Sequence, residues 1–110
     1  MWASVVALPV YRKQAAKLLT QSEAAAMEDH IAANPEGHPV LQGTGGLRKA
    51  RWKRGTRGKS GGVRTIYYFD VRTATVYMLT VYSKSQKENL TAADKRDLRK
   101  IVDRIKGREE

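Results

Sequence analysis

Lysines and arginines cluster in one internal segment of the sequence. These cations are the residues most able to bind a ligand or take part in a reaction. Residues 37–69 contain no aspartate or glutamate, yet they hold eight of the 21 lysines and arginines: Arg48, Lys49, Arg51, Lys53, Arg54, Arg57, Lys59 and Arg64. This segment carries +8 of the formal net charge of +10, so the rest of the chain is nearly balanced. Such clustering predicts a surface that binds a polyanion. A merely solubilising loop is less favoured, because the segment runs directly into the strand-like residues 66–69.

Aromatic residues are interleaved with these cations and follow them along the chain: Trp52, Tyr67, Tyr68, Tyr77 and Tyr82. Cations bind phosphates, and aromatic rings stack on unpaired bases, so the combination favours a single-stranded nucleic acid. Most of these rings are needed for the core, because alternate residues of a strand face inward. Tyr82 is the candidate for stacking, since it ends a predicted strand close to Lys84.

The chain has few residues that could support other kinds of catalysis. The absence of cysteine excludes disulfide scaffolds, zinc ribbons and cysteine nucleophiles. His30 and His38 are expected to be surface or packing histidines, and the carboxylates of the predicted helices have spacings that suit ion pairs. Residues 55–60 are rich in glycine but lack the spacing of a nucleotide-binding P-loop. We therefore expect no metal and no cofactor.

Cleavage of RNA by cations alone fits this inventory. The ribose 2′-OH attacks the adjacent phosphorus, and the 5′-oxygen leaves. An arginine holds the charge of the phosphorane, and a lysine among other cations has a lowered pKa that lets it accept a proton.

The pattern of apolar residues and turn signals predicts the elements that must position these groups. A strand over 5–8 is followed by a helix from about residue 10 and a second helix to about residue 33, which opens with the capping-box pair Thr20 and Glu23. Residues 34–46 form a loop. Strands follow over 47–52, 63–69 and 75–82, with a glycine-rich connection over 53–62 and a hairpin over 70–74. Thr91 and Asp94 resemble another cap, before a last helix that ends near Gly107.

The order β-α-α-β-β-β-α predicts one α+β domain over residues 1–110. We expect a small, mainly antiparallel sheet with the helical hairpin on one face. The last helix should lie at an edge or across part of the other face.

Four stretches of the sequence together resemble the RelE/HigB toxins of type II toxin–antitoxin systems, and within them the HigB-like branch. They are QGTGGLRKAR over 42–51, GGVRTIYYF over 61–69, YMLTVYSK over 77–84 and NLT over 89–91. The resemblance covers the C-terminal two-thirds of the chain. It implies the RelE-like microbial ribonuclease fold and cleavage of mRNA in the A site of a translating ribosome. It also implies inhibition by a cognate antitoxin, expected to be a helix-turn-helix DNA-binding protein.

The resemblance also implies roles for individual residues. Arg64 matches the family's phosphate-stabilising arginine, and Lys84 falls where the family often has another catalytic cation. Lys53, Arg54, Arg57 and Lys59 match a basic region that assists proton transfer and binds RNA. The resulting catalytic set is Arg64, Lys84, Lys59, Lys53 and Tyr82. The resulting RNA-binding set is Arg48, Lys49, Arg51, Arg54 and Arg57.

Two other functions fit the same residues. One is a ParE-like toxin of the same superfamily that poisons DNA gyrase, and the other is an RNA-binding module that does not cut. No apolar run approaches the roughly 20 residues that a membrane span needs, and the N-terminal residues lack the pattern of a signal peptide. The expected compartment is therefore the cytoplasm, without a membrane partner.

Overall fold

The computed structural model describes residues 2–53 and 62–107, and its elements follow the predicted order. They are β1 (Ser4–Ala7), α1 (Pro9–Leu18), α2 (Gln21–Ala33), β2 (Leu47–Trp52), β3 (Val63–Asp70), β4 (Thr75–Ser83) and α3 (Ala92–Gly107). Pro9 lies at the start of α1, where its missing N–H costs no helical hydrogen bond. The predicted capping box of α2 is present, and Thr91 and Asp94 exchange the corresponding hydrogen bonds before α3.

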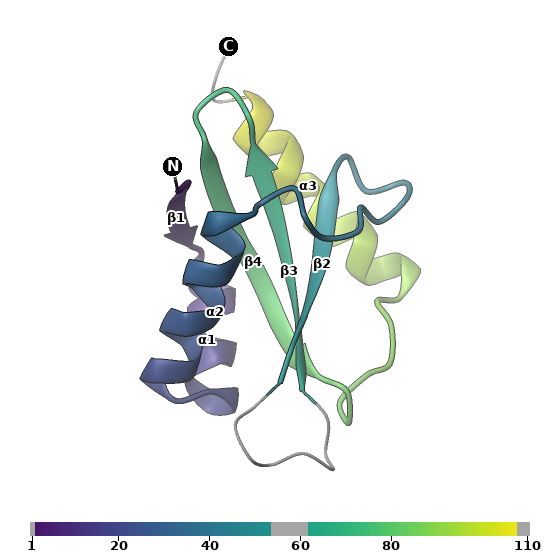
Figure 1. Cartoon of the computed structure of the whole chain (residues 1–110). Coiled ribbons are helices and arrows are strands. Elements are labelled where there is room, and N and C mark those ends of the chain that lie inside the picture. Colours follow the sequence, from purple (N-terminus) through teal and green to yellow (C-terminus); the bar gives the residue numbers. More distant parts are fainter. Residues whose placement is uncertain (1, 54–61, 108–110) are drawn as a thin grey trace.

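The four strands form one sheet in the order β1-β4-β3-β2 (Figure 1). β3 is antiparallel to both of its neighbours, whereas β1 is parallel to β4. The expected α+β class with a mainly antiparallel sheet is confirmed. In this arrangement β3 lies between β2 and β4, so its side chains have neighbours on both sides.

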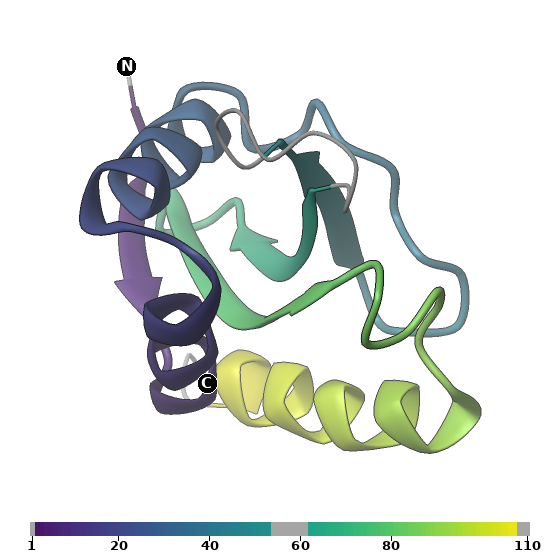
Figure 2. The ribbon, with the colours of Figure 1, turned by 90° about the horizontal axis from the view of Figure 1, so that it is seen from below.

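Each face of the sheet is covered by helices, which gives two apolar cores (Figure 2). On one face α1 and α2 contribute Tyr11, Met27 and Ile31, among others, to a core with strand residues such as Tyr67 and Met78. On the other face α3 packs Leu98 and Val102 against Leu47, Ile66, Leu79 and Tyr82. Burial on both faces explains the runs of consecutive apolar residues, 66–69 in β3 and 76–79 in β4.

A β-bulge in β4 decides which residues face α3. Ile66 pairs with Thr80, but the next residue, Tyr67, pairs with Met78, so β4 has an extra residue at this point. Strict alternation would place Met78 and Tyr82 on the same face. Instead Met78 lies in the core of α1 and α2, and Tyr82 lies in the core of α3. The bulge therefore turns Tyr82 to the α3 face.

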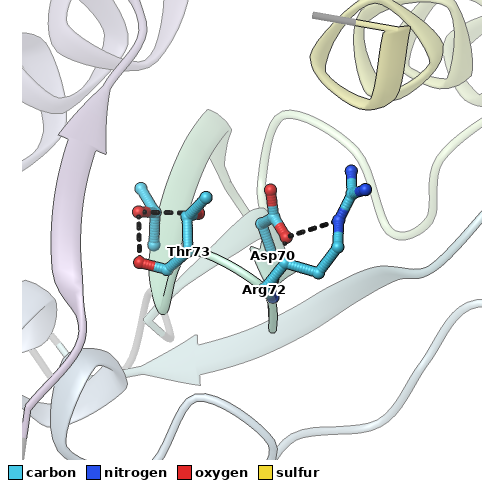
Figure 3. Close-up of polar contacts among 4 residues, drawn as sticks. Asp70, Arg72 and Thr73 are labelled. Atoms are coloured by element: carbon cyan, nitrogen blue, oxygen red, sulfur yellow. Dashed lines mark hydrogen bonds and ion pairs between the residues drawn. The ribbon is translucent and has the colours of Figure 1, made fainter. Parts of the chain in front are cut away.

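The hairpin between β3 and β4 closes through local hydrogen bonds (Figure 3), at the end of the sheet opposite to the end of β2 and the start of β3. The buried carboxylate of Asp70 accepts a hydrogen bond from the backbone N–H of Arg72 at 3.0 Å, and the Arg72 Nε lies 4.0 Å from the same oxygen. The Thr73 hydroxyl donates to that of Thr75 at 3.0 Å. Ala74 takes a positive φ of 51°, which completes the reversal of the chain.

The core of α3 yields a stability prediction. Ile66 is fully buried, so Ile66→Ala removes apolar contacts and leaves a cavity, and we expect the free energy of unfolding to fall by about 2–5 kcal/mol. Urea denaturation followed by circular dichroism measures this loss. Val71→Ala is the control, because Val71 is 67% exposed and its truncation should change stability by about 0.5 kcal/mol or less. Equal losses in the two variants would contradict this packing.

Candidate active site

The cationic face is defined here as the face of the sheet that carries Lys49, Arg51 and Arg64. Arg64 lies at its centre, on β3. It is only 8% exposed, and its register partners are Arg51 on β2 and Tyr82 on β4. Paired residues on neighbouring strands lie on the same face of a sheet. Because Ile66 and Tyr82 belong to the core under α3, Arg64, Arg51 and Tyr82 all face the α3 side.

Two buried polar atoms of this group have no hydrogen-bond partner within the described residues. They are the Nε of Arg64 and the hydroxyl oxygen of Tyr82. Leaving a buried donor unpaired costs about 1–3 kcal/mol, and native proteins rarely do so without a reason. Unpaired polar groups of this kind, next to a cluster of cations, favour a ligand rich in acceptor oxygens such as a phosphate.

Lys49 adds an ionisable amine to the same face. It lies two residues before Arg51 on β2, so the alternation of the strand places the two side chains on one side. Burial lowers the pKa of Lys49, and the nearby charges of Arg51, Arg64 and Lys95 lower it further. A lysine with a lowered pKa loses its proton more readily, which makes Lys49 suited to accept a proton from a hydroxyl.

A pocket of about 300 Å³, here called the strand-end pocket, opens at the ends of β2, β3 and β4 that lie away from the β3–β4 hairpin. It is lined by Arg51, Trp52, Lys53, Gly62, Val63, Arg64 and Lys84. Every charged residue in that lining is a cation. The structure thus brings together three predicted catalytic residues, Lys53, Arg64 and Lys84, and one predicted RNA-binding residue, Arg51.

A second, smaller pocket of about 110 Å³ lies between β2, β4 and the start of α3, and is here called the α3-side pocket. Its lining consists of Leu41, Lys49, Tyr82, Asn89, Leu90 and Lys95. Sequence reasoning did not single out Lys95, because nothing in its local pattern shows that the start of α3 lies beside β2. The helical spacing of α3 gave only the apolar face that packs on the sheet.

Tyr82 has a buried ring, which bears on its predicted stacking role. The side chain is 5% exposed and is part of the α3 core, with the Lys87 Nζ 5.8 Å from the ring centre. Burial raises the pKa of its hydroxyl, and the charge of Arg64 opposes that shift. A ring this buried offers little open face for a base to stack on.

Arg48 is placed apart from the cationic face. Its register partner Tyr67 faces α1 and α2, and its guanidinium donates to the backbone carbonyls of Glu36 at 3.2 Å and His38 at 2.7 Å. These bonds tie the loop before β2 to the sheet. The remaining predicted site residues, Arg54, Arg57 and Lys59, lie outside the described residues.

Both histidines belong to the side of the sheet covered by α2. The ring of His30 lies 5.5 Å from that of His38 and 5.4 Å from that of Trp52, and the His38 Nδ1 lies 3.1 Å from the Tyr67 hydroxyl oxygen. Burial lowers the pKa of His38, as do the nearby His30 and Arg48. Within residues 2–53 and 62–107, no group of three histidines, aspartates and glutamates is placed to hold a metal ion.

The fold and the cationic face define a small, basic α+β protein suited to hold a polyanion. A sequence model described as the RelE toxin of the RelE/RelB toxin–antitoxin system matches residues 25–110. This match spans well over half of the chain, and the chain therefore belongs to the RelE toxin family.

Solved structures share the fold. A double arginine-to-alanine mutant of the E. coli toxin RelE in the free state matches with a TM-score of 0.58 at 17% identity, over 80% of this chain and 90% of that one. The toxin–antitoxin complex RelBE2 of Mycobacterium tuberculosis matches with a TM-score of 0.58 at 22% identity, over 76% of this chain and 99% of that one. The intact E. coli RelBE toxin–antitoxin complex matches with a TM-score of 0.53 at 17% identity, over 72% of this chain and 93% of that one. None of the described helices has the length and hydropathy of a membrane span.

The crowding of cations gives a prediction about Lys49. Arg51→Gln removes one of the charges that lower the Lys49 pKa, so this pKa should rise toward the ordinary value of a lysine. NMR titration of the Lys49 side chain measures the change. Lys17→Gln, a matched charge removal in the last turn of α1, is the control and should leave the Lys49 titration unchanged. An unaltered Lys49 pKa in the Arg51→Gln variant would show that the two groups are not coupled.

Proposed function

We propose that this chain is the toxin of a toxin–antitoxin system and cleaves mRNA on the translating ribosome. The observation that carries the proposal is the alignment of Arg64 with Arg51 and Tyr82 across three strands, with Lys49 beside them and two buried polar atoms unpaired. Membership of the RelE toxin family supports the same reading. Action on ribosomes would place the protein in the cytoplasm.

In the proposed reaction, a neutral lysine takes the proton of the ribose 2′-OH. The 2′-oxygen then forms a bond to the adjacent phosphorus, and the bond from phosphorus to the 5′-oxygen breaks. The leaving oxygen receives a proton from a cationic lysine, which leaves a 2′,3′-cyclic phosphate and a 5′-hydroxyl. The lowered pKa makes Lys49 the preferred proton acceptor, and Lys53 and Lys84 in the strand-end pocket are candidate donors.

Arg64 would stabilise the charge that develops on the phosphorane oxygens. A buried guanidinium is already oriented before the reaction, and its charge is poorly screened by water, so its effect on the transition state is large. Arg51, the register partner of Arg64, would share this task at the mouth of the same pocket.

The decisive experiment maps mRNA 5′ ends in cells after brief expression of the wild type or of Arg64→Ala. We expect new 5′ ends and arrested translation with the wild type, and cleavage reduced by about 10²–10³-fold in the variant. Arg12→Ala is the control, because Arg12 is an exposed arginine on α1, and this variant should cleave as the wild type does. Circular dichroism checks that each variant is folded.

Three outcomes would contradict the proposal. Undiminished cleavage by Arg64→Ala would remove its assigned role. DNA damage with intact mRNA would select a gyrase poison, and RNA binding without new 5′ ends would select a non-catalytic module.

The proposal includes a cognate antitoxin as partner. Two of the similar structures are complexes of a toxin with its antitoxin, which supports such a partner for this chain. An acidic or amphipathic segment of the antitoxin could cover the cations of the strand-end pocket, and the antitoxin would be a helix-turn-helix protein. It could instead block entry to the ribosome by its bulk and leave the cations exposed.

A further inference from the structure

The α3-side pocket and the strand-end pocket are lined by different members of the pair formed by Arg64 and Tyr82. Arg64 lines the strand-end pocket, and Tyr82 lines the α3-side pocket. On β2 the same division holds, because Arg51 lines the first pocket and Lys49 the second. Residues two apart on a strand are separated by roughly 7 Å, which is on the scale of the spacing between neighbouring phosphates of a single strand.

The lining of the α3-side pocket is suited to an anion. Lys49 and Lys95 bring two ammonium groups from different elements, and the side-chain amide of Asn89 adds neutral N–H donors. Tyr82, whose buried hydroxyl has no partner within the described residues, is also one of the lining residues. The charge of Lys95 is one of those that lower the Lys49 pKa, so the two amines lie near each other.

Asp94, the residue before Lys95 on α3, is an acid whose carboxylate already has partners. The Asp94 carboxylate accepts hydrogen bonds from the Lys87 Nζ and from the Thr91 backbone N–H, both at 3.0 Å. Asp94 lines a different pocket, between α1, β4 and α3. Its carboxylate is thus paired with the cap of α3 and with Lys87, although its charge also raises the pKa of the Tyr82 hydroxyl.

We propose that the α3-side pocket binds the RNA phosphate next to the one that is cleaved, with Lys95 and Asn89 as the residues that bind it and Lys49 left as the proton acceptor. This inference rests on the proposed RNA substrate and assigns a role to α3. The scissile phosphate would lie against Arg64 at the strand-end pocket. The chain would therefore hold two consecutive phosphates, one at each pocket, and fix the register of the strand.

The test measures binding of a 2′-O-methyl RNA oligonucleotide, which cannot be cleaved because its 2′-oxygen carries no proton. Fluorescence anisotropy over a range of KCl concentrations gives the dependence of affinity on salt. Losing one phosphate contact lowers the log–log slope by about 0.7 for a single strand. We expect Lys95→Gln to show this decrease with a several-fold loss of affinity, and Lys95→Arg to retain the wild-type slope.

Lys100→Gln is the matched control, because Lys100 is an exposed lysine on the same helix and its loss changes the net charge equally. Indistinguishable salt slopes for Lys95→Gln and Lys100→Gln would overturn the assignment of Lys95. Thermal unfolding of both variants checks that the fold is retained.

A second measurement locates the bound phosphate. Single phosphates of the oligonucleotide are replaced in turn by neutral methylphosphonates, and each is tested against the wild type and Lys95→Gln in a double-mutant cycle. We expect one replacement, next to the bond mapped in cells, to weaken wild-type binding and to have little further effect in Lys95→Gln. Equal effects in both proteins at every position would contradict the subsite.

The two proposals fail separately. If no mRNA is cut but the salt slope depends on Lys95, Lys95 stands as a phosphate-binding residue and the cleavage proposal falls. If mRNA is cut and the slope does not depend on Lys95, only the subsite falls.

Discussion

Repulsion among like charges is the constraint on which this site depends. Arg64 is almost fully buried beside Arg51 and Lys49, and the charged residues that line the strand-end pocket within the described chain are all cations. Burying a charge without a counter-charge costs free energy. The rest of the fold must offset that cost, and a polyanionic ligand would recover part of it.

The two cores supply the offsetting stability and keep the cations in place. β3 lies between β2 and β4 and is covered on both faces, so Arg64 is carried by the best-buried strand of the sheet. The bulge in β4 then brings Tyr82 to the same face, beside Arg64. A site built on packed strands holds its side chains more rigidly than one built on loops.

The polar groups on the two faces of the sheet have different roles. On the side of α1 and α2, polar groups serve the fold: Arg48 holds the loop before β2, and the Tyr67 hydroxyl donates to the Pro35 carbonyl at 2.7 Å. On the side of α3, polar groups of Arg64 and Tyr82 are left without protein partners among the described residues. This asymmetry separates Arg48 from the cations that share its segment of the sequence.

The sequence by itself determined the elements and their order, the capping boxes, and the strand that carries Arg64, because these follow from local periodicity and turn chemistry. It also showed that one segment carries most of the positive charge, because the charge of a segment follows directly from the residues it contains. Alternation along residues 47–52 was enough to put Lys49 and Arg51 on one side of their strand. Only the tertiary structure decided which side faces α3, that Tyr82 joins Arg64 through a bulge, and that Lys95 approaches Lys49. Those facts depend on strand register and on the packing of α3, which join residues far apart in the chain and leave no local pattern in it.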